Sequence, residues 1–356
     1  MRTIKTDCFT QAHIRRESKR LSPIDPAQLE KCILAFELLG RLADAGIPLI
    51  FKGGTAVLLR LGDIRRLSVD VDISLKWPKA KLEAKLTDIG RRAPFVTWEE
   101  KKRKGPQLPR KRHYYFAYRS AISGDDDQVI LDVLDEDNLY PHVDDLPVQM
   151  PFFTPDHRIR VRVPTVEGLL GDKLTAFAPT TVGVPYDKES PVDLIKQLFD
   201  IAQLFDVAAD LPLILDTYER VFTAENSYRN NRYTKEQALE DSYEAALTLS
   251  SIDLTKKVHS EHARILQAGV KNIAPLLVTR SFTLPEAKVA AAKVALISRL
   301  IRHDRRDSRL KDFRFGRADR ASLATATMDR PLEFLAKLRG VNDEAFHYWL
   351  KTQQVH

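Results

Sequence analysis

Apolar positions along the first half of the chain alternate between two spacings. Strands are predicted where apolar residues alternate with polar ones or form short runs, over 49–51, 67–75, 111–120, 128–134 and 158–163. Helices are predicted where apolar residues recur every three or four positions, over 25–45, 56–61, 79–90 and 166–178. This mixture predicts an α/β domain with a mixed sheet over residues 1–180.

The second half of the chain has only the helical spacing. A segment rich in Thr, Gly and Pro follows Pro179, and we expect it to be a linker. The helical pattern then covers 191–208, 211–222, 235–249, 257–269, 285–302 and 331–351. We therefore expect a helical domain over residues 185–356, and the absence of an internal repeat argues against a solenoid.

Composition limits the class of protein. A chain of 356 residues with 44% hydrophobic residues is long enough for about two domains with cores of their own, which excludes disorder as the main state. The two cysteines, Cys8 and Cys32, cannot form a disulfide framework or a thiolate zinc site by themselves. No apolar run approaches the roughly 18 residues of a membrane span, and no apolar signal core follows the start, so we expect a cytoplasmic protein without membrane contact.

The most informative motif is the alternating segment 67–75. Strand geometry places Asp70 and Asp72 on one face, with their backbones roughly 7 Å apart. Both carboxylates could then reach the two ions, about 3.5 to 4 Å apart, of a two-metal site, which suits Mg²⁺ or Mn²⁺. The alternative is an ordinary half-exposed strand with solvated aspartates.

The turn at Gly53, Gly54 and Thr55 supports the metal hypothesis because it lies between a strand and a helix. Glycines permit close approach of a ligand to the backbone, and free amides at a helix start favour a phosphate. The Walker pattern is absent. A glycine pair alone predicts only a turn. The order found here is rarer, because the turn follows a strand, begins a helix and is followed by a strand with paired aspartates.

Two further residues are candidates for the same chemistry. Asp132 shares its strand face with Ile130 and Leu134, and a carboxylate among apolar neighbours favours a third metal ligand over a solvated group. The neighbouring acids at 125–127 and 135–137 are expected to be solvated loop residues. Lys173, in an apolar helix, could neutralise a triphosphate during transfer, although a surface lysine would fit the pattern equally well.

Net charge becomes informative where it is clustered. Lys and Arg outnumber Asp and Glu by 56 to 49, and the tract 101–119 contains eight of these basic residues and no acid. Such a tract, with three interleaved tyrosines, can neutralise phosphates and stack on bases, although strand packing would also explain the aromatic residues. The tract 299–320 mixes both signs and predicts a solvated, partly self-paired surface. The candidate RNA-binding residues are Lys101, Lys102, Arg103, Lys104, Arg110, Lys111 and Arg112.

Three segments between about 30 and 205 resemble the AbiEii/AbiGii-type nucleotidyltransferase toxins, a family that includes the mycobacterial MenT toxins. Residues 52–55 with 66–73 resemble the first motif, 171–176 the lysine motif, and 196–201 a Lys-Asp-Leu-Tyr-Asp-Leu segment. The resemblance implies a DNA polymerase β-like palm whose site residues this chain carries. By the resemblance, Gly54 and Thr55 hold phosphate, Asp70 and Asp72 bind metal, Lys173 contacts the triphosphate and Asp200 supports the site. With the residues argued from their own context, the candidate metal ligands are Asp70, Asp72 and Asp132, and the candidate nucleotide-binding residues are Lys52, Gly53, Gly54, Thr55, Arg66, Ser68 and Lys173.

One position departs from the family pattern. Gln197 stands where the pattern usually has its first Asp, so the acidic role falls to Asp200 or moves to Asp193. Asp193, Lys196 and Asp200 share a helix face by spacing, which fits either a functional face or simple ion pairing.

Together these features predict an Mg²⁺-dependent enzyme that transfers a nucleoside monophosphate from an NTP to RNA. Asp70, Asp72 and Asp132 would hold two ions in a cleft between the two domains. The basic tract and the resemblance favour the tRNA 3′ end as acceptor, a block of translation as the result, and a cognate antitoxin as partner. The alternatives are transfer to a protein or a small molecule such as an aminoglycoside, and a non-catalytic nucleic-acid-binding regulator.

Overall fold

The protein divides into two compact units in the computed structural model. Unit 1 comprises Met1–Thr165 and Pro275–Arg280, and unit 2 comprises Val166–Ala274 and Ser281–His356. The expected limits, 1–180 and 185–356, assign helix α5 (Val166–Ala176) to the first domain, whereas its neighbours α6, α7 and α8 all belong to unit 2. The structure describes residues 2–21, 24–101, 110–187, 190–255, 260–278 and 281–355.

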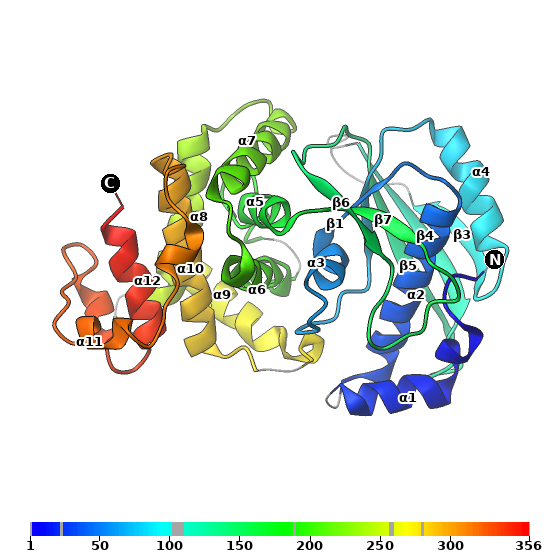
Figure 1. Ribbon diagram of the computed structural model, residues 1–356, viewed down its shortest axis with the longest axis horizontal. Helices are drawn as coiled ribbons and strands as arrows, with labels where there is room; N and C mark the ends of the chain where they lie inside the picture. The colour runs from blue at the N-terminus through cyan, green and yellow to red at the C-terminus, as the bar shows by residue number, and fades with distance from the viewer. Residues whose placement is uncertain are drawn as a thin grey trace. The chain divides into compact units, whose positions relative to one another are not determined.

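Unit 1 is built on a mixed sheet, as the sequence predicts (Figure 1). The strand order is β1-β2-β5-β4-β3; β2 and β5 are parallel and the other neighbours are antiparallel. A separate antiparallel pair is formed by β6 and β7. The strand bounds are β1 (Ile50–Lys52), β2 (Val71–Ser74), β3 (Phe95–Lys101), β4 (Lys111–Arg119), β5 (Asp126–Leu134), β6 (Val143–Pro147) and β7 (Arg160–Pro164).

Apolar and polar side chains alternate along the strands of the main sheet, so one face of the sheet is apolar and the other is polar. Helices α2 (Pro26–Asp44) and α4 (Lys79–Gly90) pack against the sheet. Each large side chain that is fully buried in this core contributes roughly 1.5 to 3 kcal/mol. The opposite face carries the polar residues of β2, β4 and β5. The buried apolar positions of these strands are Val71, Ile73, Tyr114, Phe116, Tyr118, Val129, Leu131 and Val133.

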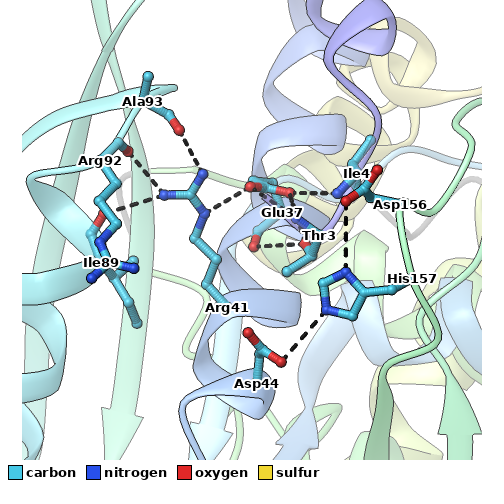
Figure 2. Close-up of polar contacts among 10 residues, drawn as sticks. All are labelled: Thr3, Ile4, Glu37, Arg41, Asp44, Ile89, Arg92, Ala93, Asp156 and His157. Atoms are coloured by element: carbon cyan, nitrogen blue, oxygen red, sulfur yellow. Dashed lines mark hydrogen bonds and ion pairs between the residues drawn. The ribbon is translucent and has the colours of Figure 1, made fainter. Parts of the chain in front are cut away.

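A buried ion pair on α2 ties distant segments of unit 1 together (Figure 2). Arg41 Nε lies 2.7 Å from Glu37 Oε1, and both side chains are buried. Glu37 also accepts a hydrogen bond from the backbone N–H of Thr3 at 3.0 Å. Arg41 donates to the carbonyl oxygens of Arg92 at 2.9 Å and Ala93 at 2.6 Å. The pair therefore anchors the N-terminal segment and the turn after α4 to the same helix.

The remaining helices of unit 1 are short, and the described residues of unit 2 form helices joined by loops, without a strand (Figure 1). In unit 2, α10 packs against α8, α12, α6 and α9. None of the described helices combines the length and apolar content needed to cross a membrane. The other bounds are η1 (Thr6–Phe9), α1 (Gln11–Arg20), α3 (Gly53–Leu61), α6 (Val192–Val207), α7 (Leu211–Ser227), α8 (Lys235–Ser251), α9 (Glu261–Asn272), η2 (Ala274–Leu276), α10 (Leu284–Arg302), η3 (Leu310–Phe313), α11 (Asp319–Leu323), η4 (Glu333–Leu338) and α12 (Asp343–Gln353).

Two element predictions are wrong in their extent. The helix expected over 331–351 is split into η4 and α12, because Gly340 adopts a φ of +75° and the Asn342 side chain caps α12. The strand expected over 67–75 is shorter, because the backbone at 65–67 pairs with 276–278 instead of continuing the sheet.

The edge strand β3 was not predicted, since most of its residues are exposed and lack an apolar alternation.

Candidate active site

One row of register partners crosses the polar face of the main sheet. Lys52 on β1 pairs with Asp72 on β2, and Asp72 pairs with Asp132 on β5. Asp132 pairs on its other side with His113 on β4, which pairs with Lys101 on β3. Since register partners on neighbouring strands point to the same side of a sheet, the row brings two carboxylates next to each other, flanked by basic groups.

Strand β2 separates its polar and apolar residues as the pattern predicts. Val71 and Ile73 are fully buried, whereas Asp70 and Asp72 are partly exposed. Asp70 lies immediately before the strand. The segment therefore presents its two aspartates on the partly exposed side and its apolar residues to the core.

The Gly53-Gly54 turn lies directly against this strand and the segment before it. Gly53 has a φ of +75°, and a Cβ there would overlap the carboxylate of Asp72. A Cβ on Gly54 would lie 2.6 Å from Arg66 Nη2 and 2.7 Å from Ser68 Oγ. Both glycines are therefore required by close approach. The turn at the start of α3 places backbone beside a carboxylate, a guanidinium and a hydroxyl, which is a suitable arrangement for a metal-bound phosphate.

Thr55 joins the turn to the aspartate segment. Its hydroxyl donates to the backbone carbonyl oxygen of Asp70 at 2.6 Å, and the residue is fully buried. The sequence suggested that this hydroxyl binds phosphate. In the structure it fixes the spacing between the turn and Asp70, and its contact with a phosphate stays a prediction.

Asp132 has basic partners at both carboxylate oxygens. Lys111 Nζ lies 2.5 Å from Oδ2, and His113 Nδ1 lies 2.6 Å from Oδ1. Burial alone would lower the pKa of Lys111, but the carboxylates of Asp132 and Asp72 raise it above its ordinary value. Lys111 is therefore a stable cation beside both acids. Within the described residues, no group of three or more His, Cys, Asp or Glu side chains is placed to hold a metal ion.

Glu136 is a member of the site region that sequence reasoning missed. It was expected to be a solvated loop acid, but it is buried and lies 3.6 Å from Lys52 Nζ. It also accepts a hydrogen bond from Ser74 Oγ at 2.7 Å. Its position after β5 gives no sign of this burial, which depends on the pairing of β5 with β2. Lys52 is consequently held at the edge of the polar row.

Lys173 and Asp200 form a buried pair in unit 2. Lys173 Nζ lies 3.1 Å from Asp200 Oδ2 and 3.0 Å from Gln197 Oε1. The side chains of Lys173 and Asp200 are 8% and 1% exposed, which excludes a solvated surface lysine. Asp193 instead pairs with Lys196 at 3.0 Å near the surface. Asp200 is therefore the acid that holds the lysine, and Gln197 adds an uncharged acceptor.

The basic tract is only partly described. Lys102, Arg103 and Lys104 lie outside the described residues. Lys101 and Arg110 are exposed, and Lys101 also lies over the Tyr115 ring. Of the remaining predicted RNA contacts, Lys111 pairs with Asp132 as described, and Arg112 pairs with Asp135 at 3.3 Å.

The second basic tract, 299–320, is ion-paired partly within itself, as predicted, and partly with acids of α7 and α8. Arg299 and Arg302 pair with Glu240, and Arg306 pairs with Asp216 and Asp304. Exposed pairs of this kind contribute little to stability. They also leave less uncompensated charge for a polyanion.

Comparison with known proteins yields one family and a set of solved structures. The family model described as nucleotidyl transferase AbiEii toxin, type IV TA system, matches residues 37–314. JHP933 from Helicobacter pylori is similar at 16% identity, over 80% of this chain and 95% of that one, with a TM-score of 0.44. A second H. pylori structure, provisionally assigned as a nucleotidyltransferase, has 16% identity over 81% and 96% and a TM-score of 0.37. No curated protein matches the chain.

Proposed function

The chain belongs to the AbiEii family of nucleotidyltransferase toxins of type IV toxin–antitoxin systems, and from this premise we propose that it transfers a nucleoside monophosphate from an NTP to RNA. The observation that carries the proposal is the contact of the Gly53-Gly54 turn with Asp72, Arg66 and Ser68. It combines a phosphate-binding backbone with a carboxylate that binds hard cations. We further propose that the unit 1 sheet is a polymerase β-like palm, since its polar face carries this turn and the aspartates.

Asp70 and Asp72 are the proposed ligands of Mg²⁺ or Mn²⁺. Their oxygens are the donor type that these ions prefer, and both side chains are partly exposed. When bound, the ion would polarise the α-phosphate and offset negative charge that develops during transfer. The backbone amides at Gly53 and Gly54, with Arg66 and Ser68, would orient the phosphates.

Lys173 is proposed to neutralise charge on the triphosphate. Asp200 and Gln197 hold its ammonium in one place, so little side-chain entropy remains to be lost when a phosphate binds. Because Asp200 is buried and Asp193 is tied to Lys196 near the surface, we assign the supporting acid to Asp200.

RNA is the proposed acceptor, and the 3′ end of tRNA is its proposed site. Lys101 and Arg110, the described ends of the basic tract, are exposed, and the contacts of Lys101 with Glu99 and the Tyr115 ring are themselves at the surface, so both cations could meet a phosphate backbone. Modification of that end would stop translation in the cytoplasm, and the type IV family implies an antitoxin as partner. A cationic aminoglycoside would instead require an acidic surface at this tract.

The acceptor is tested with matched charge reversals. Lys101→Glu/Arg110→Glu should weaken RNA labelling about tenfold or more and make it less salt-dependent, because two phosphate contacts are lost. Lys19→Glu/Arg91→Glu changes the net charge equally at exposed residues elsewhere in unit 1 and should have little effect. Equal labelling by all three proteins would point to a protein or small-molecule acceptor. RNA binding without any turnover would favour a non-catalytic regulator.

A further inference from the structure

We propose that the ammonium of Lys111 takes the place of a second metal ion at Asp132, so that the chain binds a single divalent ion at Asp70 and Asp72. The proposal deepens the proposed function and rests on it for the identity of the ion site. It assigns Asp132 to the positioning of Lys111, in place of the metal-ligand role expected from the sequence.

The need for a cation at this point follows from the sheet register. Asp72 and Asp132 are direct partners on parallel strands, whose backbones lie about 4.8 Å apart. Two carboxylates at such a separation repel each other, and a cation beside them offsets this repulsion. A two-ion site meets this need with a second divalent ion.

Lys111 already supplies a cation beside these two carboxylates. Its Nζ lies 2.5 Å from Asp132 Oδ2, and Asp132 is the register partner of Asp72. Lys111 stands two residues before His113 on β4, so both side chains emerge on the polar face and reach the same carboxylate.

Asp132 has little capacity left for a metal. His113 Nδ1 lies 2.6 Å from its other oxygen, and only 15% of the Asp132 side chain is exposed. A metal ion at Asp132 would have to displace a short ion pair and leave the Lys111 ammonium, with 29% of its side chain exposed, close to the incoming charge. Asp70 and Asp72 are partly exposed and lie at the Gly53-Gly54 turn, where we propose that the phosphates bind.

The proposal predicts the number of bound ions. Manganese titration of the whole chain, followed by electron paramagnetic resonance and without nucleotide, should give one Mn²⁺ per chain in the wild type. Lys111→Met removes the ammonium and frees Asp132, so it should bind two. The matched control Lys101→Met removes a lysine from the same sheet at its exposed edge and should still bind one.

Asp132→Asn provides a second, independent variant. The single variant Asp132→Asn should bind one Mn²⁺ per chain, like the wild type. The double variant with Lys111→Met should also bind one, whereas Lys111→Met alone should bind two. A wild-type count other than one, an unchanged count in Lys111→Met, or the loss of an ion in Asp132→Asn would each overturn the proposal. The count does not depend on the acceptor: one bound Mn²⁺ without any label transfer would refute the proposed function and leave this inference standing.

Discussion

Asp72 and Asp132 are register partners on adjacent parallel strands, although they lie far apart in the sequence. The Gly53-Gly54 turn touches Asp72 from one side, and Lys111 and His113 hold Asp132 from the other. The two acids therefore have different surroundings and different roles. Asp72 lies against the turn for which we propose phosphate binding, and Asp132 holds the ammonium of Lys111.

Gly53→Ala should impair transfer by moving Asp72. Gly53 and Gly62 have φ values of +75° and +66°, so alanine at either position carries a similar backbone strain of about 1 kcal/mol. Only at Gly53 would the added Cβ overlap a carboxylate, whereas the space at Gly62 is open. We expect kcat/KM to fall about 10²-fold in Gly53→Ala and to change little in Gly62→Ala, since an ångström of misplacement has such an effect. Equal kinetics in the two variants would contradict the assigned role of the turn.

Asp200→Asn should lower both stability and activity, and Asp193→Asn should lower neither by much. The first change leaves the buried ammonium of Lys173 without its charged partner, which costs about 3 to 5 kcal/mol. The second removes a partly exposed pair with Lys196, worth under about 1 kcal/mol. Urea unfolding of both variants measures the loss of stability, and single-turnover kinetics measure the loss of activity. A larger loss in Asp193→Asn would transfer the acidic role to that residue.

Asp127 should make stability depend on acid pH. Burial alone would raise its pKa, but Lys31 at 2.8 Å, the backbone N–H of Gln128 and the Tyr118 hydroxyl lower it below the ordinary value. A lowered pKa in the folded state gives stability that is present above the unfolded pKa of about 3.9 and lost as the pH falls through the folded one.

Asp127→Asn should therefore be less stable than the wild type at pH 7, by up to about 1 kcal/mol because the carboxylate is partly exposed. The difference should shrink as the pH is lowered below 4. Urea midpoints over this range measure it. A difference that is independent of pH would show that the Asp127 charge contributes nothing.

Arg41→Met should be among the most destabilising single changes in unit 1. It leaves Glu37 buried without its partner and removes donors from the carbonyl oxygens after α4 (Figure 2). The expected loss of unfolding free energy is about 3 to 5 kcal/mol. Arg20→Met removes a half-exposed guanidinium from Glu17, which keeps Arg16 as a second partner, and should cost under about 1 kcal/mol. Similar losses in chemical denaturation would show that burial is not the deciding factor.

The sequence predicted those features of the site that depend on local pattern. Period-two spacing identified the exposed face of Asp70 and Asp72, and the glycine pair identified the turn beside them. Helical spacing predicted most helices of unit 2. These features depend on residues close together in the chain, where periodicity and turn chemistry decide the structure.

The features that escaped prediction depend on strand order and register. Which lysine faces Asp132 is known only once β4 is seen to pair with β5, and Glu136 is buried only because of the ladder beside it. Likewise, the Thr55 hydroxyl meets the Asp70 carbonyl through the packing of α3 against β2. The sequence also did not indicate that Lys111 and Arg112 are ion-paired within the sheet, because their acidic partners lie on another strand or after it.

The most direct test of nucleotidyl transfer follows which phosphate of the NTP reaches the acceptor. The chain is incubated with Mg²⁺, total RNA and each NTP labelled at either the α- or the γ-phosphate, beside Asp72→Asn and the matched surface variant Asp126→Asn. We predict that RNA takes up the α-label from one NTP, never the γ-label, with the wild type and Asp126→Asn but not with Asp72→Asn. Transfer of the γ-label, or full α-labelling by Asp72→Asn, would contradict the proposed chemistry and its site.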